Sequence, residues 1–171
     1  RASVSDVDST ADYSITSALY KLASKHGIKY ILSGHSFRTE AISPLSWTYM
    51  DGRYLKEVHS KFGKKSIKSF PLMSLYDLLF YIFINGIKFT FLLENTDYNK
   101  DKVKGILAEK LGWIDYGGHH HDSTFTNFFQ SYYLPKKFNI DKRMKEYSAL
   151  ILSGQMVRKV GLDKITNTNY P

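Results

Sequence analysis

The sequence of 171 residues contains no cysteine. This absence excludes disulfide bonds, thiolate catalysis and any zinc site built from cysteine ligands. It is compatible with a reducing compartment, and no apolar signal region precedes the first helix, so we expect a cytoplasmic protein. The chain also starts without methionine, and we therefore expect it to begin inside a longer protein.

A long uninterrupted hydrophobic run is missing as well. The most apolar window, residues 75–93, is interrupted by Asp77, Asn85, Gly86 and Lys88. A charge near the centre of a membrane span costs about 3 kcal/mol on insertion scales, which makes a span unfavourable here. We predict instead a helix over residues 74–84 followed by an extended segment over 87–93, with no membrane insertion.

Acidic residues are few in comparison with basic ones. The chain has 16 Asp and Glu against 24 Lys and Arg, which gives a net charge of +8. This charge suits an anionic ligand such as a nucleotide or a sugar phosphate, but it suits RNA or an acidic membrane surface equally well. With 43% hydrophobic residues, the chain is long enough to bury a substantial core as one domain.

Residues 28–40 have the pattern of a ligand-binding edge of a parallel sheet. Residues 28–32 are a short, mostly apolar run that predicts an interior parallel strand buried on both faces. Ser33, Gly34 and His35 end this strand, and Thr39 with Glu40 opens a helix. Ligands of open α/β sheets bind at this end of the strands, where glycine permits close approach and histidine offers hydrogen bonds. An ordinary turn with a solvated imidazole is the alternative.

Helical patterns surround this strand. Before it, apolar residues recur at the spacing of one helix face: Ile15, Ala18, Leu19, Leu22 and Ala23. We expect Asp12 or Ser14 to cap this helix and Gly27 to end it. Asn99 and Gly112 bracket a later helix. Further helical patterns cover residues 123–133, 142–152 and 156–165, separated by Pro135 and Gly154. We predict one domain over residues 1–171, with an α/β part over 1–95 and a helical region over 96–171.

Residues 116–123 concentrate titratable groups behind two glycines and in front of a helix. Three interpretations fit this pattern. His119, His120 and His121 with Asp122 supply zinc-binding groups, although neighbouring side chains in an extended chain point to opposite sides. The segment could instead bind an anion at the helix N-terminus, or Asp122 or Ser123 could simply cap the helix.

Lys142 and Arg143 place two cations at the start of a predicted helix. Cations there oppose the helix dipole, so the placement favours a compensating anion. A solvated face, or pairing with Asp141, is the simpler explanation.

These residues, in this order, resemble the N-acetyl sugar amidotransferases of bacterial surface-polysaccharide (lipopolysaccharide O-antigen) biosynthesis, which belong to the PP-loop ATP pyrophosphatase superfamily. The resemblance covers nearly the whole chain. Its most specific parts are residues 27–35 with Thr39-Glu40, and Leu111-Gly112-Trp113 leading to Tyr116-Gly117-Gly118-His119-His120. It continues through Phe125-Thr126, Gln130, residues 133–138, Asp141-Lys142-Arg143, residues 148–151 and Ser153-Gly154-Gln155-Met156.

The resemblance implies a Rossmann-like α/β fold of the adenine-nucleotide α-hydrolase type with a helical C-terminal half. It implies an ATP- and Mg²⁺-dependent ligase that converts the acetamido group of a sugar to an acetamidino group, with ammonia from a separate glutaminase. The nucleotide contacts that follow from it are Ser33, Gly34, His35, Glu40 and His119. The catalytic residues that follow from it are Lys142, Arg143 and His120, and no metal ligand is assigned.

The sequence departs from this family in two places. The superfamily's Ser-Gly-Gly-x-Asp-Ser pyrophosphate loop is absent, so we expect a C-terminal portion that is inactive alone. His119 occupies a position that is often lysine in relatives, which weakens its phosphate role. The competing hypothesis is a non-catalytic nucleic-acid-binding module that uses the basic surface, whereas the amidotransferase hypothesis expects no nucleic-acid partner.

Overall fold

The computed structural model describes residues 2–7, 9–40, 43–44, 47, 51–117 and 121–166. The chain forms two compact units, and each unit contains two separate segments of the sequence. The first unit comprises Arg1–Ser33 and Pro44–Phe91, and the second comprises Gly34–Ser43 and Leu92–Pro171. The predicted division of one domain near residue 95 stays a prediction.

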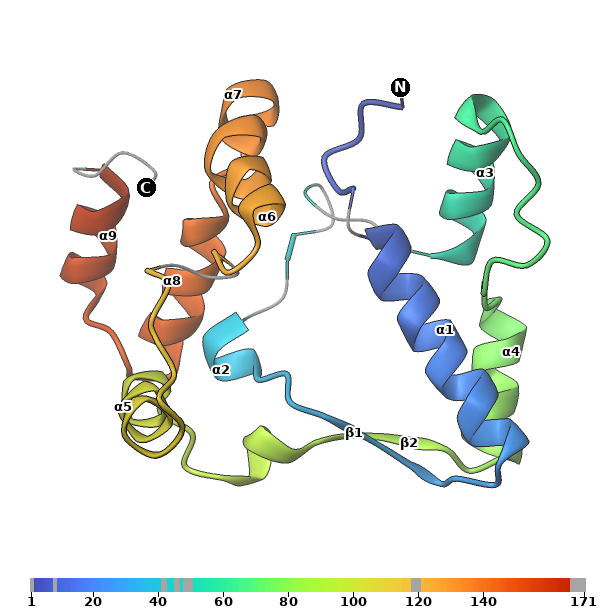
Figure 1. Cartoon of the computed structure of the whole chain (residues 1–171), viewed down its shortest axis with the longest axis horizontal. Coiled ribbons are helices and arrows are strands. Elements are labelled where there is room, and N and C mark those ends of the chain that lie inside the picture. The colour runs from blue at the N-terminus through green and yellow to red at the C-terminus, as the bar shows by residue number, and fades with distance from the viewer. Residues whose placement is uncertain are drawn as a thin grey trace. The chain divides into compact units, whose positions relative to one another are not determined.

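The first unit combines helices with a small parallel sheet (Figure 1). Its elements are α1 (Ser9–Lys25), β1 (Tyr30–Ser33), α3 (Gly52–Phe62), α4 (Leu75–Leu79), the π-helical turn η1 (Phe80–Ile84) and β2 (Lys88–Phe91). β1 and β2 pair in parallel, with Tyr30 opposite Lys88 and Leu32 opposite Thr90. The described part of the chain is therefore mixed α/β and mostly helical, as predicted, with one parallel pair of strands. A full Rossmann-like sheet remains an expectation.

The prediction of an interior first strand buried on both faces is wrong, because β1 pairs with β2 alone in the described sheet and is covered on one face. Ile31 is buried, but the neighbouring side chains Tyr30 and Leu32 are 60% and 63% exposed. Successive strand residues point to opposite faces, so only the face that carries Ile31 is covered. On that face Ile31 joins a core of Tyr20, Ala23, Met73 and Ile87, with Phe89 packed against it.

Helix α1 also buries a different face from the one that its aliphatic spacing predicted. The helix starts at Ser9, before both expected caps, and ends before Gly27, whose φ of 67° lies in the left-handed region. Its buried residues are Ser17, Tyr20 and Ala23. Of the predicted face, Ala23 is therefore buried, whereas Ile15, Leu19 and Leu22 are exposed. Tyr20 decides this orientation because its ring stacks on Tyr81 at 5.8 Å between centroids.

The helix predicted over residues 74–84 is confirmed as α4 followed by η1. Ser74 forms a capping box with Asp77: the Asp77 N–H donates to Ser74 Oγ at 3.2 Å, and the Ser74 N–H donates to Asp77 Oδ2 at 2.8 Å. Hydrogen bonds from the Ser74 hydroxyl and backbone hold the pKa of Asp77 below its ordinary value. The extended segment that follows is β2. None of the described helices has the length and apolar content needed to cross a membrane.

The described part of the second unit is helical, as predicted for the second half of the chain. Its elements are α2 (Phe37–Glu40), the 3₁₀ turn η2 (Leu92–Asn95), α5 (Lys100–Leu111), α6 (Thr124–Phe128), the π-helical turn η3 (Phe129–Tyr133), α7 (Leu134–Phe138), α8 (Lys142–Leu152) and α9 (Arg158–Thr166). The predicted ends of α5 are confirmed. Asn99 accepts a hydrogen bond from the Lys102 N–H, and Gly112 follows the helix with a φ of 64°.

Pro135 does not separate two helices, contrary to the prediction. α6, η3 and α7 follow one another without a break from Thr124 to Phe138, and Pro135 lies in the first turn of α7. Proline lacks an N–H group, and its ring collides with the preceding turn of a regular α-helix. The wider π-helical turn at Phe129–Tyr133 lies directly before it, which lets the helix continue.

Candidate functional site

The short helix α2 brings together two of the predicted nucleotide contacts. His35 Nε2 lies 3.4 Å from Glu40 Oε2, and the Ser36 N–H donates to Glu40 Oε1 at 3.4 Å. Ser36 is fully buried, and its hydroxyl accepts a hydrogen bond from the Arg38 N–H at 3.2 Å. Gly34 precedes this turn in the second unit, whereas Ser33 ends β1 in the first. The segment is therefore an ordered turn in which Glu40 holds the imidazole.

The predicted basic pair lies at the N-terminus of α8. Arg143 is directed at the helix cap, since Arg143 Nη2 lies 2.7 Å from Asp141 Oδ2 and Nε lies 3.1 Å from both carboxylate oxygens. Asp141 also caps the helix by accepting a hydrogen bond from the Arg143 N–H at 2.9 Å. Lys142 is half-buried in the same turn. Arg143 thus takes part in the intrahelical pairing that was the simpler alternative for this motif.

Only His121 of the three clustered histidines is among the described residues. His119 and His120 lie outside the described residues, so their predicted roles stay predictions. Ser123 caps α6 by accepting a hydrogen bond from the Thr126 N–H at 3.2 Å, as the capping alternative predicted. Within the described ranges, no group of three or more His, Asp or Glu side chains could hold a metal ion.

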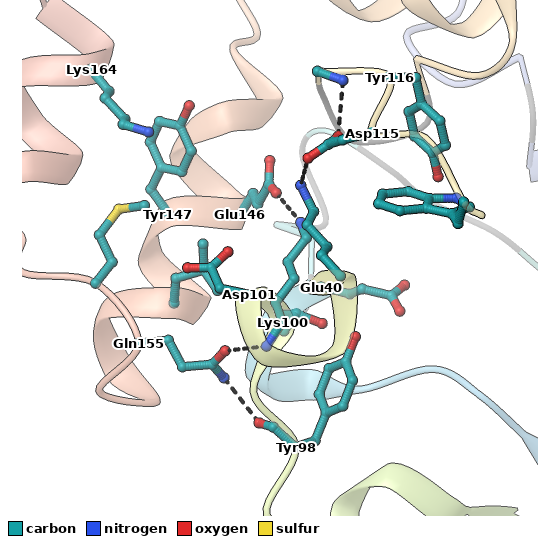
Figure 2. Close-up of a pocket in the computed structure, with 16 residues that line it drawn as sticks. Glu40, Tyr98, Lys100, Asp101, Asp115, Tyr116, Glu146, Tyr147, Gln155 and Lys164 are labelled. Atoms are coloured by element: carbon teal, nitrogen blue, oxygen red, sulfur yellow. Dashed lines mark hydrogen bonds and ion pairs between the residues drawn. The ribbon is translucent and has the colours of Figure 1, made fainter. Parts of the chain in front are cut away.

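The second unit contains a cavity of about 390 Å³ that the sequence patterns did not predict as a site (Figure 2). It lies between α2, α5, α8, α9 and the segment after α5. Its titratable lining combines three lysines, Lys100, Lys104 and Lys164, with four carboxylates, Glu40, Asp101, Asp115 and Glu146. Four aromatic residues, Tyr98, Trp113, Tyr116 and Tyr147, add flat apolar surface. Of the predicted site residues, Glu40 lines this cavity.

Two of the lysines are held by carboxylates. Lys100 Nζ lies 2.5 Å from Glu146 Oε1, and both side chains are mostly buried. Lys104 Nζ lies 2.6 Å from Asp115 Oδ2 in a more exposed position. The hydrogen bond from Lys104, with a second from the Gly117 N–H, keeps the pKa of Asp115 below its ordinary value. The positive charges of Lys100 and Lys104 are therefore already compensated.

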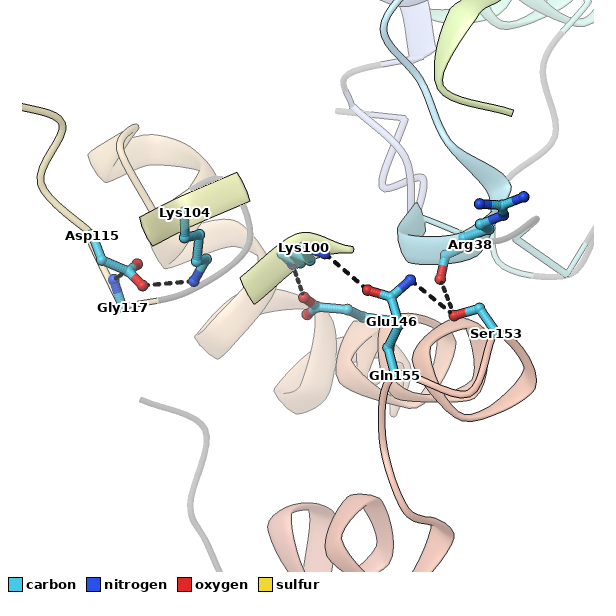
Figure 3. Close-up of polar contacts among 8 residues, drawn as sticks. All are labelled: Arg38, Lys100, Lys104, Asp115, Gly117, Glu146, Ser153 and Gln155. Carbon is cyan, nitrogen blue, oxygen red and sulfur yellow. Dashed lines mark hydrogen bonds and ion pairs between the residues drawn. The ribbon is translucent and has the colours of Figure 1, made fainter. Parts of the chain in front are cut away.

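Gln155 fixes the N-terminal end of α5 to the turn after α8. Its Oε1 accepts a hydrogen bond from the Lys100 N–H at 2.9 Å, and its Nε2 donates to Ser153 Oγ at 3.2 Å (Figure 3). The same Nε2 donates to Tyr98 O at 3.3 Å (Figure 2). The Ser153 hydroxyl in turn donates to Arg38 O at 2.9 Å, which connects α2 to the same network. Gln155 therefore determines where Lys100 stands in the cavity wall.

Tyr147 and Lys164 form a further part of the wall. Lys164 Nζ lies 5.9 Å from the centroid of the Tyr147 ring, within the range of a cation–π contact. Burial, together with the nearby Glu146 carboxylate, raises the pKa of the Tyr147 phenol, and Arg143 opposes this change. At neutral pH the phenol therefore keeps its proton and can donate a hydrogen bond to a ligand.

The lining fits a polar ligand of low charge better than a triphosphate. The carboxylates outnumber the lysines by one, and the first turn of α5, a common phosphate site, has its Lys100 and Lys102 N–H groups occupied by Gln155 and Asn99. Aromatic walls with a few charged hydrogen-bonding groups are usual in pockets that orient small polar molecules. The described residues of this cavity do not fit the phosphates of ATP.

Residues 122–171 match the family described as LPS biosynthesis protein WbpG-like, C-terminal domain. This similarity supports a polysaccharide-biosynthesis protein family. It also supports a role in lipopolysaccharide biosynthesis as part of an enzyme-related protein. No curated protein and no solved structure matches the chain. Within the matched segment lie the cavity residues Glu146, Tyr147, Leu150, Gln155, Met156 and Lys164.

Most cavity residues were missed as site residues because no local pattern marks them. Lys100 and Glu146 are 46 positions apart, and Lys104 is separated from Asp115 by 11. Each looks like an ordinary surface charge in its own helix or loop. The Ser153-Gly154-Gln155-Met156 motif of the resemblance was the signal that could have led to the Gln155 network.

Proposed function

We propose that the protein amidates an N-acetylated sugar in lipopolysaccharide biosynthesis, and that the cavity of the second unit holds the sugar. The use of ATP and Mg²⁺, the PP-loop superfamily, and a separate glutaminase as ammonia source are part of this proposal and rest on the resemblance. The cavity is the observation that carries the sugar assignment. The family similarity gives no support to a nucleic-acid-binding module.

The cavity offers a sugar two kinds of contact. Tyr98, Trp113 and Tyr116 present apolar ring surface, which suits the C–H faces of a pyranose, and Trp113 and Tyr116 brace each other edge to face at 5.4 Å between centroids. Charged side chains supply donors and acceptors for hydroxyl and acetamido groups. A volume of about 390 Å³ is adequate for one sugar residue.

The charge of the lining suits the product of the reaction. In the proposed reaction ammonia would form the new carbon–nitrogen bond, and the acetamido oxygen would leave with the AMP portion of ATP. The acetamidino product is protonated at neutral pH, so positive charge develops as the carbon–nitrogen bond forms. Glu40 and Asp101 are the lining carboxylates outside the two lysine pairs. A fixed carboxylate beside a developing cation lowers the barrier more than it aids binding of the neutral substrate.

Fluorescence titration tests the sugar assignment. Trp113 lies in the lining and Trp47 does not, and these are the two tryptophans of the chain, so a Trp47→Phe background reports the cavity alone. We expect N-acetylglucosamine and its acetamidino counterpart to change the Trp113 emission in a saturable way. A response to ATP with none to either sugar would refute the assignment.

The same titration tests the charge argument. Asp101→Asn should weaken binding of the acetamidino sugar by about three- to fivefold, the scale of one exposed charge contact, and should change binding of the acetamido sugar by less than about 1.5-fold. Asp97→Asn is the matched control because Asp97 is exposed and outside the lining. Equal losses for both sugars would contradict a role for Asp101 in recognising the amidinium.

A further inference from the structure

The helical stretch α6–η3–α7 carries an exposed line of aromatic side chains. Phe125, Phe128 and Tyr132 are 57%, 53% and 56% exposed. Their spacing of three and four residues places them on one side of the helix, and we call these three residues the aromatic stripe. The neighbouring residues Phe129 and Leu134 are buried, so the stretch has one covered side and one exposed aromatic side.

Each ring of the stripe stacks on another aromatic ring. The Phe128 and Tyr132 rings stack at 5.5 Å with an interplanar angle of 26°. Phe125 stacks on the buried Phe129 at 5.9 Å and 12°, which fixes its orientation. The stripe therefore presents a preformed apolar ridge, and little side-chain entropy remains to be lost when it is covered.

The charge along this helix has one sign. From Thr124 to Phe138 there is no acidic residue, and the stretch contains Lys136 and Lys137. Lys136 is exposed one turn beyond Tyr132, and Lys137 Nζ lies 5.0 Å from the Tyr133 ring and donates to the Tyr133 hydroxyl at 2.8 Å. The cations therefore follow the aromatic stripe at the C-terminal end of the same helix.

We propose that this face docks on an anionic lipid surface. Aromatic rings are favoured at the boundary between head groups and acyl chains, and lysines beside them attract lipid phosphates. A helix with an aromatic edge and a basic end lies in the plane of this boundary and does not cross the bilayer. The proposal is independent of the reaction at the cavity.

The ring geometry favours lipid over single-stranded nucleic acid. A base stacks on an open ring face, whereas the Phe125 and Phe128 rings already stack on Phe129 and Tyr132. Each of these stacking contacts already covers one ring face, which leaves a base fewer faces to stack on, whereas an apolar lipid interior covers the rings without any directional requirement.

Vesicle sedimentation of the full chain tests the proposal. We expect it to bind vesicles of phosphatidylcholine containing roughly a third phosphatidylglycerol, to bind pure phosphatidylcholine weakly, and to dissociate as salt rises. Phe128→Ser and Tyr132→Ser should each lower the partition coefficient about tenfold. Lys136→Gln should lower it about fivefold on anionic vesicles alone.

Two exposed substitutions outside the stripe serve as matched controls. Leu152 is 88% exposed, and Lys159 is exposed in α9, so Leu152→Ser and Lys159→Gln change the same kinds of side chain elsewhere. Both should bind vesicles as the unchanged chain does, and circular dichroism of every variant verifies folding.

Three results would overturn the proposal. The first is equal vesicle binding by the Phe128→Ser/Tyr132→Ser double variant and the unchanged chain. The second is binding of single-stranded RNA that depends on the stripe, without vesicle binding. The third is a dimer that the stripe variants convert to a monomer, again without vesicle binding.

Discussion

Replacing Gln155 by leucine should destabilise the contact between the start of α5 and the turn after α8, with little change in the volume of the cavity. Leucine is similar in size to glutamine but makes no hydrogen bonds. The substitution therefore removes the bonds to the Lys100 N–H, Tyr98 O and Ser153 Oγ, which have lengths of 2.9, 3.3 and 3.2 Å. The Lys100 N–H in the first turn of α5 would then lose its partner.

The magnitude follows from these three contacts. Each hydrogen bond contributes about 1 kcal/mol net, and the two that exceed 3.1 Å contribute less than the first. Gln155 is half-buried, so water can reach part of the exposed polar groups. We expect the free energy of unfolding of the second unit to fall by about 2 kcal/mol.

Urea unfolding followed by Trp113 fluorescence measures this loss in the Trp47→Phe background, because Trp113 belongs to the second unit. With a slope of about 1–2 kcal/mol/M, the transition midpoint should move down by about 1–2 M. Gln155→Glu retains the acceptor for the Lys100 N–H but loses both donors, so its midpoint should lie between those of Gln155→Leu and the unchanged chain.

Glu109→Gln provides the control for a polar substitution at an exposed site in α5 and should leave the midpoint unchanged. A Gln155→Leu midpoint equal to that of the unchanged chain would show that Gln155 does not stabilise this end of α5. The network in Figure 3 would then be a consequence of the packing and not a cause of it.

Three smaller changes test individual contacts. Ser74→Ala removes the hydroxyl that lowers the Asp77 pKa, so this pKa should rise toward its ordinary value, which carboxyl NMR titration measures. The stability that the capping box contributes is present above the unfolded pKa and is lost in acid, and this contribution should become smaller in the variant. Lys104→Met should raise the Asp115 pKa in the same assay, and an unchanged titration would show that the Gly117 N–H suffices. Gly112→Ala should lower the free energy of unfolding by about 1 kcal/mol, as measured by thermal unfolding. The cost should be purely conformational, because φ of Gly112 is 64° and an added Cβ would contact no neighbour. An unchanged free energy of unfolding would contradict this reasoning.

Local features of the fold could be predicted because short-range chemistry determines them. Asn99 and Gly112 bound α5 through one side-chain acceptor and one left-handed residue, both of which depend on adjacent backbone only. The parallel pairing of the first strand was also predicted, but from burial on both faces, which the structure does not show.

The buried faces could not be predicted in the same way. α1 has apolar residues on more than one side, and its aliphatic spacing pointed to Ile15 and Leu22, whereas the large Tyr20 ring makes the core contact. Tertiary packing chose between these faces, and a single sequence contains no measure of that choice. Pro135 misled for a related reason, since the π-helical turn before it absorbs the steric conflict.

The candidate site was predicted in part by resemblance and hardly at all by pattern. Glu40 is both a predicted ligand contact and a cavity residue, and Gln155 lies in a quoted motif. The pairing of Lys100 with Glu146 depends on how two helices pack, so their charges carried no signal of a shared site.

The contact between Ser153 and Arg38 spans 115 positions of sequence, and it has a consequence for how the second unit folds. Closing a loop costs entropy that rises by about 0.6 kcal/mol for each doubling of its length. The helices after Leu92 can associate through shorter loops, so α2 should join them late. A chain cut before Leu92 would keep α5, α8 and α9 but lose Thr39 and Glu40, leaving one wall of the cavity open to solvent.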